Sequence, residues 1–278
     1  MQQRNFIKMH GLGNDFVIVE SAVPGPIFSE QQARQIADRR WGVGCDQLIT
    51  LEPTKTAGAD IFMRIQNTDG SEAEACGNAT RCVARLMMDR SGEDRLVIET
   101  LRGLLDCWIA DSGQISVAMG APLFEWRDIP LVREHDSLHL PIECQGLSDP
   151  VGLSVGNPHC VFFVKNAESI EFQLIGAEIE NHPLFPNRTN VQFVDVKDRS
   201  TIRQRVWERG VGVTEASGSG ACAGALASMR RGLTDRCVDV HLDGGILNIA
   251  WRDDNQVVMT GPTAHAFTGR LDEALLRE

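Results

Sequence analysis

The sequence Gly13-Asn14-Asp15-Phe16 has a counterpart in Gly156-Asn157-Pro158-His159, 143 residues further along the chain. A second pair, Cys76-Gly77-Asn78 and Ser217-Gly218-Ser219, keeps nearly the same spacing at 141 residues, and each member opens an apolar stretch. The third pair, 142 residues apart, is Gly103-Leu104-Leu105-Asp106 and Gly245-Ile246-Leu247-Asn248. Because three anchors recur in the same order, the chain is predicted to contain two copies of a unit of about 140 residues.

The first copy is predicted to contain strands around two helices. Ser29-Glu30-Gln31-Gln32 is a capping box that opens a helix, and Gly42 is predicted to end that helix. A second helix is expected after Cys76, because the apolar residues from Cys82 to Met87 fall on one helical stripe. Strands are expected over residues 6–19, 48–51, 96–100, 104–109 and 115–119.

The second copy repeats this pattern. Its helix follows Ser217, carries an apolar stripe from Ala221 to Met229 and ends before Gly232. Strands are expected over residues 202–207, 238–242, 246–251 and 257–260. Many short strands around few helices, without strict alternation, indicate an α+β fold. Proline, tryptophan and charged residues interrupt the pattern at residues 122–130, which divides the chain into predicted domains at residues 1–121 and 122–263.

The composition is that of a globular protein with a small-molecule partner. The chain has 278 residues and a mass of 30.6 kDa, with 42% hydrophobic and 23% charged residues, enough to bury one or two cores. Its 27 basic and 38 acidic residues give a net charge of −11, which argues against nucleic acid or a membrane surface as partner. No apolar run reaches the roughly 18 residues of a membrane span, and no signal-peptide pattern is present, so a cytoplasmic protein is expected.

The eight cysteines are expected to be reduced thiols, because the chain has no C-x-x-C pair and no secretion signal. Cys76 differs in its predicted place at a helix N-terminus, where the helix dipole favours a thiolate. Cys82 and Cys222 fall on the apolar faces of their helices, and Cys160 enters an apolar strand, so these three are interpreted as buried structural residues. The seven histidines lack metal-ligand spacing, and no metal site is predicted.

The segments that precede both central helices are polar and rich in glycine. Asn67-Thr68-Asp69-Gly70 leads to Cys76, and Glu208-Arg209-Gly210 leads to Ser217. N–H groups at a helix start bind anions, and glycine lets a ligand approach the backbone, so a carboxylate would fit at either helix. The polar residues at these helix starts could equally be ordinary caps. The duplication favours two half-sites that hold one ligand across a shared cleft.

Other motifs are matched less well. The spacing Gly218-x-Gly220-x-x-x-Gly224 is similar to a dinucleotide fingerprint, but its last interval is one residue too long. The chain has no G-x-x-x-x-G-K-[ST] sequence, and neither Ser217 nor Ser219 lies in a G-x-S-x-G sequence. A phosphate-binding loop and a hydrolase nucleophile are therefore not predicted.

The repeated motifs resemble those of the diaminopimelate epimerase family over essentially the whole chain. The matching segments are residues 9–16, residues 67–72 running to 76–78, residues 156–160, and residues 208–210 through 218–223. The resemblance implies a cofactor-independent isomerase that interconverts LL- and meso-diaminopimelate on the route to lysine and peptidoglycan. It also implies two pseudo-symmetric domains, each a mostly antiparallel barrel-like sheet around a central helix. Residues 264–278 would return to the first domain, and the protein would be a homodimer.

The resemblance also assigns roles to residues. Inverting an α-carbon without pyridoxal phosphate needs a base on each face of the carbon, and the family has cysteines at the positions of Cys76 and Ser217. His159 and Glu208 would tune these two acid/base groups. Further substrate-binding roles are implied for Asn14, Gln47, Asn67, Asn157, Asn190, Glu208 and Arg209, and for the backbone N–H groups of Gly77, Asn78, Gly218 and Ser219.

The chain departs from the family pattern at Ser217, where the second catalytic cysteine is expected. Thr214 and the residues from Ala216 to Ala223 otherwise fit, so a shifted alignment does not explain the serine. A hydroxyl is a far weaker acid than a thiol, and impaired epimerisation is therefore expected. The serine is either a natural divergence or an introduced replacement. Two alternatives stay open: a protein that binds diaminopimelate without inverting it, and a related racemase or isomerase that acts on another amino acid.

Overall fold

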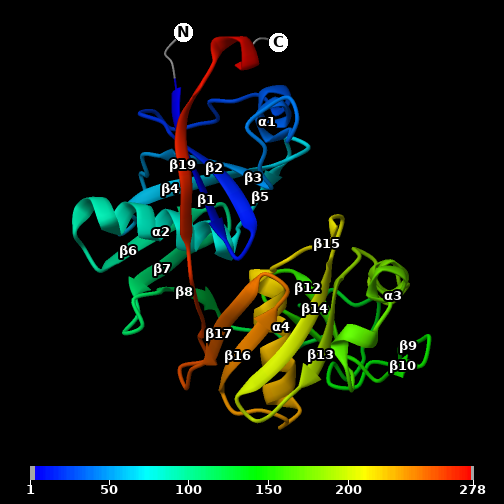
Figure 1. The fold of residues 1–278 in the computed structure, drawn as a ribbon. Helices are drawn as coiled ribbons and strands as arrows, with labels where there is room; N and C mark the ends of the chain where they lie inside the picture. The colour runs from blue at the N-terminus through cyan, green and yellow to red at the C-terminus, as the bar shows by residue number, and fades with distance from the viewer. Residues whose placement is uncertain (1–3, 277–278) are drawn as a thin grey trace. The chain divides into compact units, whose positions relative to one another are not determined.

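The computed structural model describes residues 4–276 as short strands around a few helices, arranged in two units (Figure 1). The first unit takes the described residues up to Val117 and from Gly261 onward, and the second takes Ala118–Thr260. The elements of the first unit are β1 (Arg4–Gly11), β2 (Asn14–Glu20), α1 (Glu30–Ala37), β3 (Gln47–Glu52), β4 (Ile61–Asn67), β5 (Glu72–Ala73), α2 (Gly77–Ser91), β6 (Arg95–Thr100), β7 (Gly103–Ile109), β8 (Ile115–Gly120), β19 (Ala264–Leu271) and the 3-10 turn η2 (Glu273–Leu276).

The second unit follows the same order. Its elements are β9 (Glu143–Cys144), β10 (Leu147–Ser148), β11 (Val151–Ser154), β12 (Pro158–Phe163), η1 (Ala167–Ser169), α3 (Phe172–Glu180), β13 (Asn190–Val196), β14 (Thr201–Glu208), β15 (Gly212–Val213), α4 (Gly218–Arg230), β16 (Cys237–Leu242), β17 (Gly245–Trp251) and β18 (Val257–Gly261).

The two units share one pattern of strand pairing. In the first, β2 pairs with β3 and β4 with β6 in parallel, and the pairs β1–β2, β3–β4, β6–β7 and β7–β8 are antiparallel. In the second, the parallel pairs are β12–β13 and β14–β16, and the antiparallel pairs are β11–β12, β13–β14, β16–β17 and β17–β18. The repeat seen in the sequence is thus a repeat of topology, and the expected α+β class with mostly antiparallel strands is confirmed.

The register of the parallel pairs places equivalent polar residues at equivalent points. Gln47 on β3 lies opposite Phe16, and Asn190 on β13 lies opposite His159. The strand that follows turns back antiparallel in each unit, so that Asn67 lies opposite Gln47. The polar ends of these strands therefore gather near the start of the central helix of their own unit.

The central helices are buried because of their composition. The middle of α4 consists almost entirely of small residues, and every residue from Gly220 to Ser228 is buried. In α2 the stripe residues Cys82 and Val83 are buried as predicted, whereas Leu86 and Met87 are only partly buried. Cys82, Cys160 and Cys222 are fully buried, which confirms their interpretation as structural residues. Figure 1 shows α2 and α4 each lying against the strands of its own unit.

Two local predictions were wrong. The apolar stretch over residues 6–19 is a hairpin of two strands, because Leu12 and Gly13 both adopt positive φ angles, of 57° and 89°, and turn the chain. Helix α1 begins at the predicted capping box but ends at Ala37, well before Gly42. The carboxylate of Asp38 accepts the N–H groups of Arg40 and Trp41, both at 2.7 Å, and so draws the chain out of the helix.

Gly42 is needed for a different reason. A Cβ atom at this position would lie 2.0 Å from the Gln35 carbonyl oxygen and 2.7 Å from that of Ile36. The loop after α1 therefore packs against the helix backbone, where only glycine fits. The sequence pattern predicted that Gly42 ends α1, but Gly42 instead allows the loop after α1 to pack against the helix.

The last strand, β19, pairs antiparallel with β1 from Arg4↔Leu271 to His10↔Ala264. Figure 1 shows it running alongside β1 in the first unit. Four consecutive side chains, from His265 to Thr268, are exposed, although the Phe267 ring also contacts Phe6 edge to face, with the ring centroids 5.9 Å apart. Within residues 4–276, no helix combines the length and the apolar character that crossing a membrane requires.

Candidate active site

Cys76 is the N-cap residue of α2, with an extended backbone at φ −149° and ψ 109°. Its sulfur lies 3.9 Å from Oδ1 of Asn14, and the same oxygen accepts a hydrogen bond from Nδ2 of Asn78 at 3.1 Å. The side chain is partly exposed, whereas most other cysteines are buried. Helix geometry leaves the first N–H groups of α2 without an acceptor in the helix itself, so the thiol stands beside an anion-binding helix start.

Gln47 and Asn67 form a second group in the first unit. Nε2 of Gln47 donates to Oδ1 of Asn67 at 3.0 Å, and Nδ2 of Asn67 donates to the Ser71 hydroxyl at 3.1 Å. Both amides lie at strand ends that the β3–β4 register brings opposite each other. Asp46, next to Gln47, accepts a hydrogen bond from Nδ2 of Asn14 at 2.9 Å. The structure thus places Asp46 beside Asn14, a contact that the sequence did not suggest.

Ser217 is the N-cap residue of α4, the position that Cys76 has in α2. Its hydroxyl accepts the Gly220 N–H at 3.1 Å and donates to Oε2 of Glu208 at 2.7 Å. The other carboxylate oxygen of Glu208 accepts a hydrogen bond from the Thr214 hydroxyl at 2.5 Å. Glu208 therefore contacts residue 217 directly and is held in place by Thr214, so it is placed to exchange a proton with the side chain at position 217.

His159 lies between two side-chain amides and is fully buried. Its Nδ1 is 3.0 Å from Nε2 of Gln192, and its Nε2 is 2.8 Å from Oδ1 of Asn157. Accepting at Nδ1 and donating at Nε2 is the arrangement of a neutral imidazole. Asn157 in turn donates to the Ser219 hydroxyl at 3.3 Å. Ser217 hydrogen-bonds to Glu208 and Gly220, whereas the hydrogen bonds of His159 to Gln192 and Asn157 lead through Asn157 to Ser219 at the start of α4.

Asn190 and Arg209 meet through the backbone. Nδ2 of Asn190 donates to the Pro158 carbonyl at 2.9 Å, and its Oδ1 accepts the Arg209 N–H at 3.0 Å. The Arg209 guanidinium donates to the Asn187 carbonyl at 3.1 Å. Buried Glu180 on α3 accepts the Gly210 N–H at 2.8 Å, which fixes the turn that carries Glu208 and Arg209. In this state both ends of the Asn190 amide bind backbone groups.

Burial distinguishes the structural thiols from Cys76. Burial raises the pKa of Cys45 and of Cys82 to about 12, and it raises the pKa of Cys107 and Cys160 as well. These four thiols stay protonated at neutral pH and are poor nucleophiles or bases.

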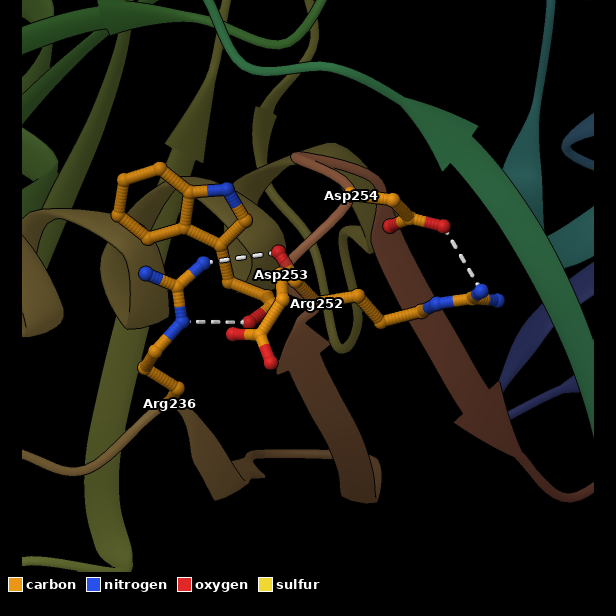
Figure 2. Close-up of a pocket in the computed structure, with 5 residues that line it drawn as sticks. Arg236, Arg252, Asp253 and Asp254 are labelled. Carbon is orange, nitrogen blue, oxygen red and sulfur yellow. Dashed lines mark hydrogen bonds and ion pairs between the residues drawn. The ribbon is translucent and has the colours of Figure 1, made fainter.

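A pocket of about 540 Å³ in the second unit is separate from both groups of residues (Figure 2). It is lined by Arg236, Trp251, Arg252, Asp253 and Asp254. Arg236 donates to the carbonyls of Trp251 and Arg252, both at 2.8 Å, and Arg252 pairs with Asp254 at 2.7 Å. These arginines are already occupied by neighbours, and none of the predicted site residues lines the pocket.

A model of the family described as diaminopimelate epimerase matches residues 6–125 and 151–266. The chain belongs to this family. The relative from Rhodospirillum centenum, named diaminopimelate epimerase, is 50% identical and is covered over 98% of this chain and 94% of its own. The relative of the same name from Rhizorhabdus wittichii is 51% identical, with 97% of this chain and 96% of its own covered. The members of this family are isomerases.

More distant solved structures share the fold. A hydroxyproline epimerase from Agrobacterium vitis superposes with a TM-score of 0.69 at 15% identity, over 98% of this chain and 91% of its own. A PhzF-family phenazine biosynthesis protein from Bacillus anthracis gives the same TM-score at 17% identity, over 98% and 99%. At such identities the likeness concerns the fold alone.

The contacts that sequence reasoning missed belong to residues between the family motifs. Asp46, Gln192 and Glu180 are polar residues in or beside apolar segments, and each contacts a predicted site residue or its turn. Polar residues inside an apolar strand were the available signal for Gln192, since a buried amide needs a partner. The repeat offered no signal for Asp46.

Proposed function

We propose that the chain moves the proton at one α-carbon of diaminopimelate, interconverting the LL and meso isomers without an organic cofactor or metal. The observation that supports this most is the equivalence of Cys76 and Ser217, which are the N-cap residues of the two central helices in a chain of this family. Inversion needs an acid/base group on each face of the carbon, and an N-cap side chain in each unit can supply one.

In this mechanism one group removes the α-proton and the other returns a proton from the opposite face. Negative charge develops on the α-carboxylate, and the first N–H groups of α2 and α4, at Gly77, Asn78, Gly218 and Ser219, would stabilise it. These donors are fixed by the helices, so little reorganisation accompanies the reaction. Asn14, beside Cys76, and Asn157, beside Ser219, would orient the reacting end of the substrate.

Glu208 would serve the group at position 217. Its carboxylate oxygen is 2.7 Å from the Ser217 hydroxyl, so it can accept a proton from that position and return it. His159 would act one step further away, because it holds Asn157 and through it Ser219. Glu208→Gln should therefore reduce proton transfer at residue 217, while His159→Gln should raise KM more than it lowers kcat.

The distal amino-acid end of the substrate would be held by Gln47, Asn67, Asn190 and Arg209. Arg209 is the cationic member of this set and suits a carboxylate, since its guanidinium can form two parallel hydrogen bonds. The amides suit the second ammonium and carboxylate groups. A substrate with one amino-acid head would leave these residues unused.

Ser217 favours a second candidate function, a protein that binds diaminopimelate but does not invert it. A serine hydroxyl is almost never ionised near neutral pH, so it is a poor base even at a helix start. Calorimetric titration with each isomer, together with a turnover assay, separates the two functions. Binding with no change in isomer composition supports the binding protein, and measurable conversion of one isomer into the other supports the epimerase.

We propose a cytoplasmic homodimer as the working form. The family's reaction belongs to lysine and peptidoglycan precursor synthesis, which favours a cytoplasmic location. Strand β19 supports self-association. It pairs with β1, and it exposes an apolar side chain, Phe267, with 48% of its surface accessible. Sedimentation velocity tests the dimer, and a Phe267→Lys variant should dissociate it.

A further inference from the structure

Asp46 and Asp15 bind each other's backbone just beside Asn14. Oδ2 of Asp46 accepts the Asp15 N–H at 3.0 Å, and Oδ1 of Asp15 accepts the Asp46 N–H at 2.9 Å. The same Oδ2 of Asp46 also accepts Nδ2 of Asn14 at 2.9 Å. This reciprocal pair joins the start of β2 to the segment that enters β3, and it leaves the Asp46 carboxylate fixed against the Asn14 carboxamide.

An ionised carboxylate only accepts hydrogen bonds, so Asn14 must turn its NH₂ group toward Asp46. Its oxygen then points the other way, toward the Cys76 sulfur at 3.9 Å and Nδ2 of Asn78 at 3.1 Å. We propose that Asp46 is a positioning residue that fixes the Asn14 carboxamide with its oxygen facing the Cys76 sulfur. Asp46 acts on the thiol through Asn14.

The surrounding charges hold this arrangement. Arg39, from the loop after α1, binds Oδ1 of Asp46 at 2.9 Å and both oxygens of Asp15. Lys8 on β1 is buried and pairs with Asp15 at 2.6 Å. Burial raises the pKa of the Asp15 carboxyl, but hydrogen bonds from Arg39 and Lys8 outweigh it and lower that pKa to about 2. From α2, the fully buried Arg81 reaches the β1–β2 hairpin, where a Cβ atom on Gly11 would lie 3.0 Å from its guanidinium.

The consequence concerns the proton on Cys76, whose acid/base role rests on the proposed function. A carbonyl oxygen that faces the sulfur accepts from the S–H group and favours the thiol, whereas an NH₂ group would favour the thiolate. The second unit differs, because Glu208 contacts residue 217 directly. The two acid/base positions therefore differ. The Asp46 carboxylate acts on Cys76 through the Asn14 amide, whereas the Glu208 carboxylate contacts residue 217 directly.

The test measures the reactivity of Cys76 with iodoacetamide across pH, with each labelled cysteine identified by mass spectrometry, and it needs no substrate. The variants are Asp46→Ala, Asn14→Ala and the double variant. Asp46→Ala removes a negative charge in either background, but it can release the carboxamide only where Asn14 is present. The Asn14→Ala background is thus the matched control for charge.

In the chain with Asn14, Asp46→Ala should lower the midpoint pH of Cys76 labelling further than it does in the Asn14→Ala background. The expected difference is about 0.5–1 pH unit, the size of one net hydrogen bond. Equal shifts in the two backgrounds would overturn the proposal. Exposed Cys237 serves as the internal reference, and labelling of the six buried cysteines would report unfolding.

A measurement on the unaltered chain covers the case in which Asp46→Ala does not fold. Nδ2 of Asn14 and the Asp15 N–H donate to one oxygen, so NMR cross-relaxation between the Asn14 NH₂ and the Asp15 N–H is expected. The proposal would be overturned if the Asn14 NH₂ instead showed cross-relaxation to the Cys76 β-protons and none to the Asp15 N–H. Both measurements are made without turnover, so either can fail while the epimerase function stands.

Discussion

Replacing Ser217 with cysteine should restore rapid epimerisation. The side chain at this position is the N-cap of α4 and lies 2.7 Å from the Glu208 carboxylate, so a thiol placed there would have both a helix start and a proton acceptor beside it. A Cβ atom at Gly220 would lie 2.9 Å from the Ser217 hydroxyl oxygen, so the glycine keeps a further side chain away from position 217.

The expected gain follows from what a positioned acid/base group contributes. Such a group accelerates proton transfer by about 10²–10⁴, which corresponds to roughly 3–5 kcal/mol of barrier. Serine keeps the hydrogen bonds to Glu208 and Gly220 but is a much weaker acid than a thiol, so most of this contribution is absent from the unaltered chain. Substrate affinity should change little, because the helix N–H groups are the same in both forms.

The assay follows loss of the α-proton signal in D₂O by ¹H NMR, starting separately from the LL and meso isomers. Isomer composition is measured by chromatography. Ser217→Cys should raise the rate by at least about 10² in both directions. Cys76→Ala, introduced into the Ser217→Cys chain, should abolish the gain because one face of the carbon then lacks a base.

A chain with Ser217 that already turns over as fast as its cysteine form would refute the two-thiol mechanism. Activity that survives Cys76→Ala in the restored chain would refute the assignment of Cys76. Calorimetry on the same variants separates loss of catalysis from loss of binding.

Three further predictions concern binding, pH and packing. Arg209→Ala should weaken diaminopimelate binding at least about tenfold, as measured by calorimetry, because a substrate carboxylate loses its guanidinium partner. Arg95 is exposed and paired with Asp106, so Arg95→Ala should leave the affinity unchanged. Equal losses would contradict the distal site. Asp15→Asn should lower unfolding free energy by about 1–2 kcal/mol above pH 4, because the folded-state pKa is depressed to about 2. That difference should vanish as the pH falls from about 4 to 2, and a pH-independent difference in urea unfolding would contradict the linkage. Gly42→Ala should cost about 1–3 kcal/mol, since its Cβ would lie 2.0 Å from a backbone oxygen, and an unchanged urea midpoint would show that the loop can move.

Arg85→Ala is a poor control for the Arg209→Ala binding experiment, although the sequence suggests that Arg85 is exposed. The apolar stripe predicts Arg85 on the solvated side of its helix, but its side chain is partly buried, donates to the Gly113 carbonyl and pairs with Asp89. Its replacement would disturb the contact between α2 and the turn before β8. Arg95 is the better control, because its side chain is 71% exposed.

The sequence by itself determined the features that depend on local chemistry and on the repeat. The capping box at Ser29 predicted the start of α1, and the apolar stripes after Cys76 and Ser217 predicted α2 and α4. Pairs of motifs at one spacing predicted two copies of a unit, because each copy must bury the same apolar faces. Most predicted strands agree with the structure to within about two residues, since alternation and turn residues are local signals.

The elements that the sequence did not reveal have weak local signals. Helix α3 contains Gly176 in its middle, where a Cβ atom would lie 2.6 Å from Trp207, so packing rather than helix propensity decides it. Strand β13 buries Gln192 and Asp195 among apolar residues, and the fold supplies the partners that such buried polar groups need. In α3, by contrast, tertiary contacts override what the glycine prefers locally.

Only the tertiary structure decided which polar groups touch. The sequence predicted the same role for His159 and Glu208, tuning the acid/base groups. In the structure Glu208 contacts residue 217, whereas His159 is held between two side-chain amides. Asp46 binds Asn14 from 32 residues away through the pairing of β2 with β3. A hydrogen bond depends on distance and direction within a few tenths of an ångström, and strand register and helix position fix these, whereas residue type and spacing along the chain do not.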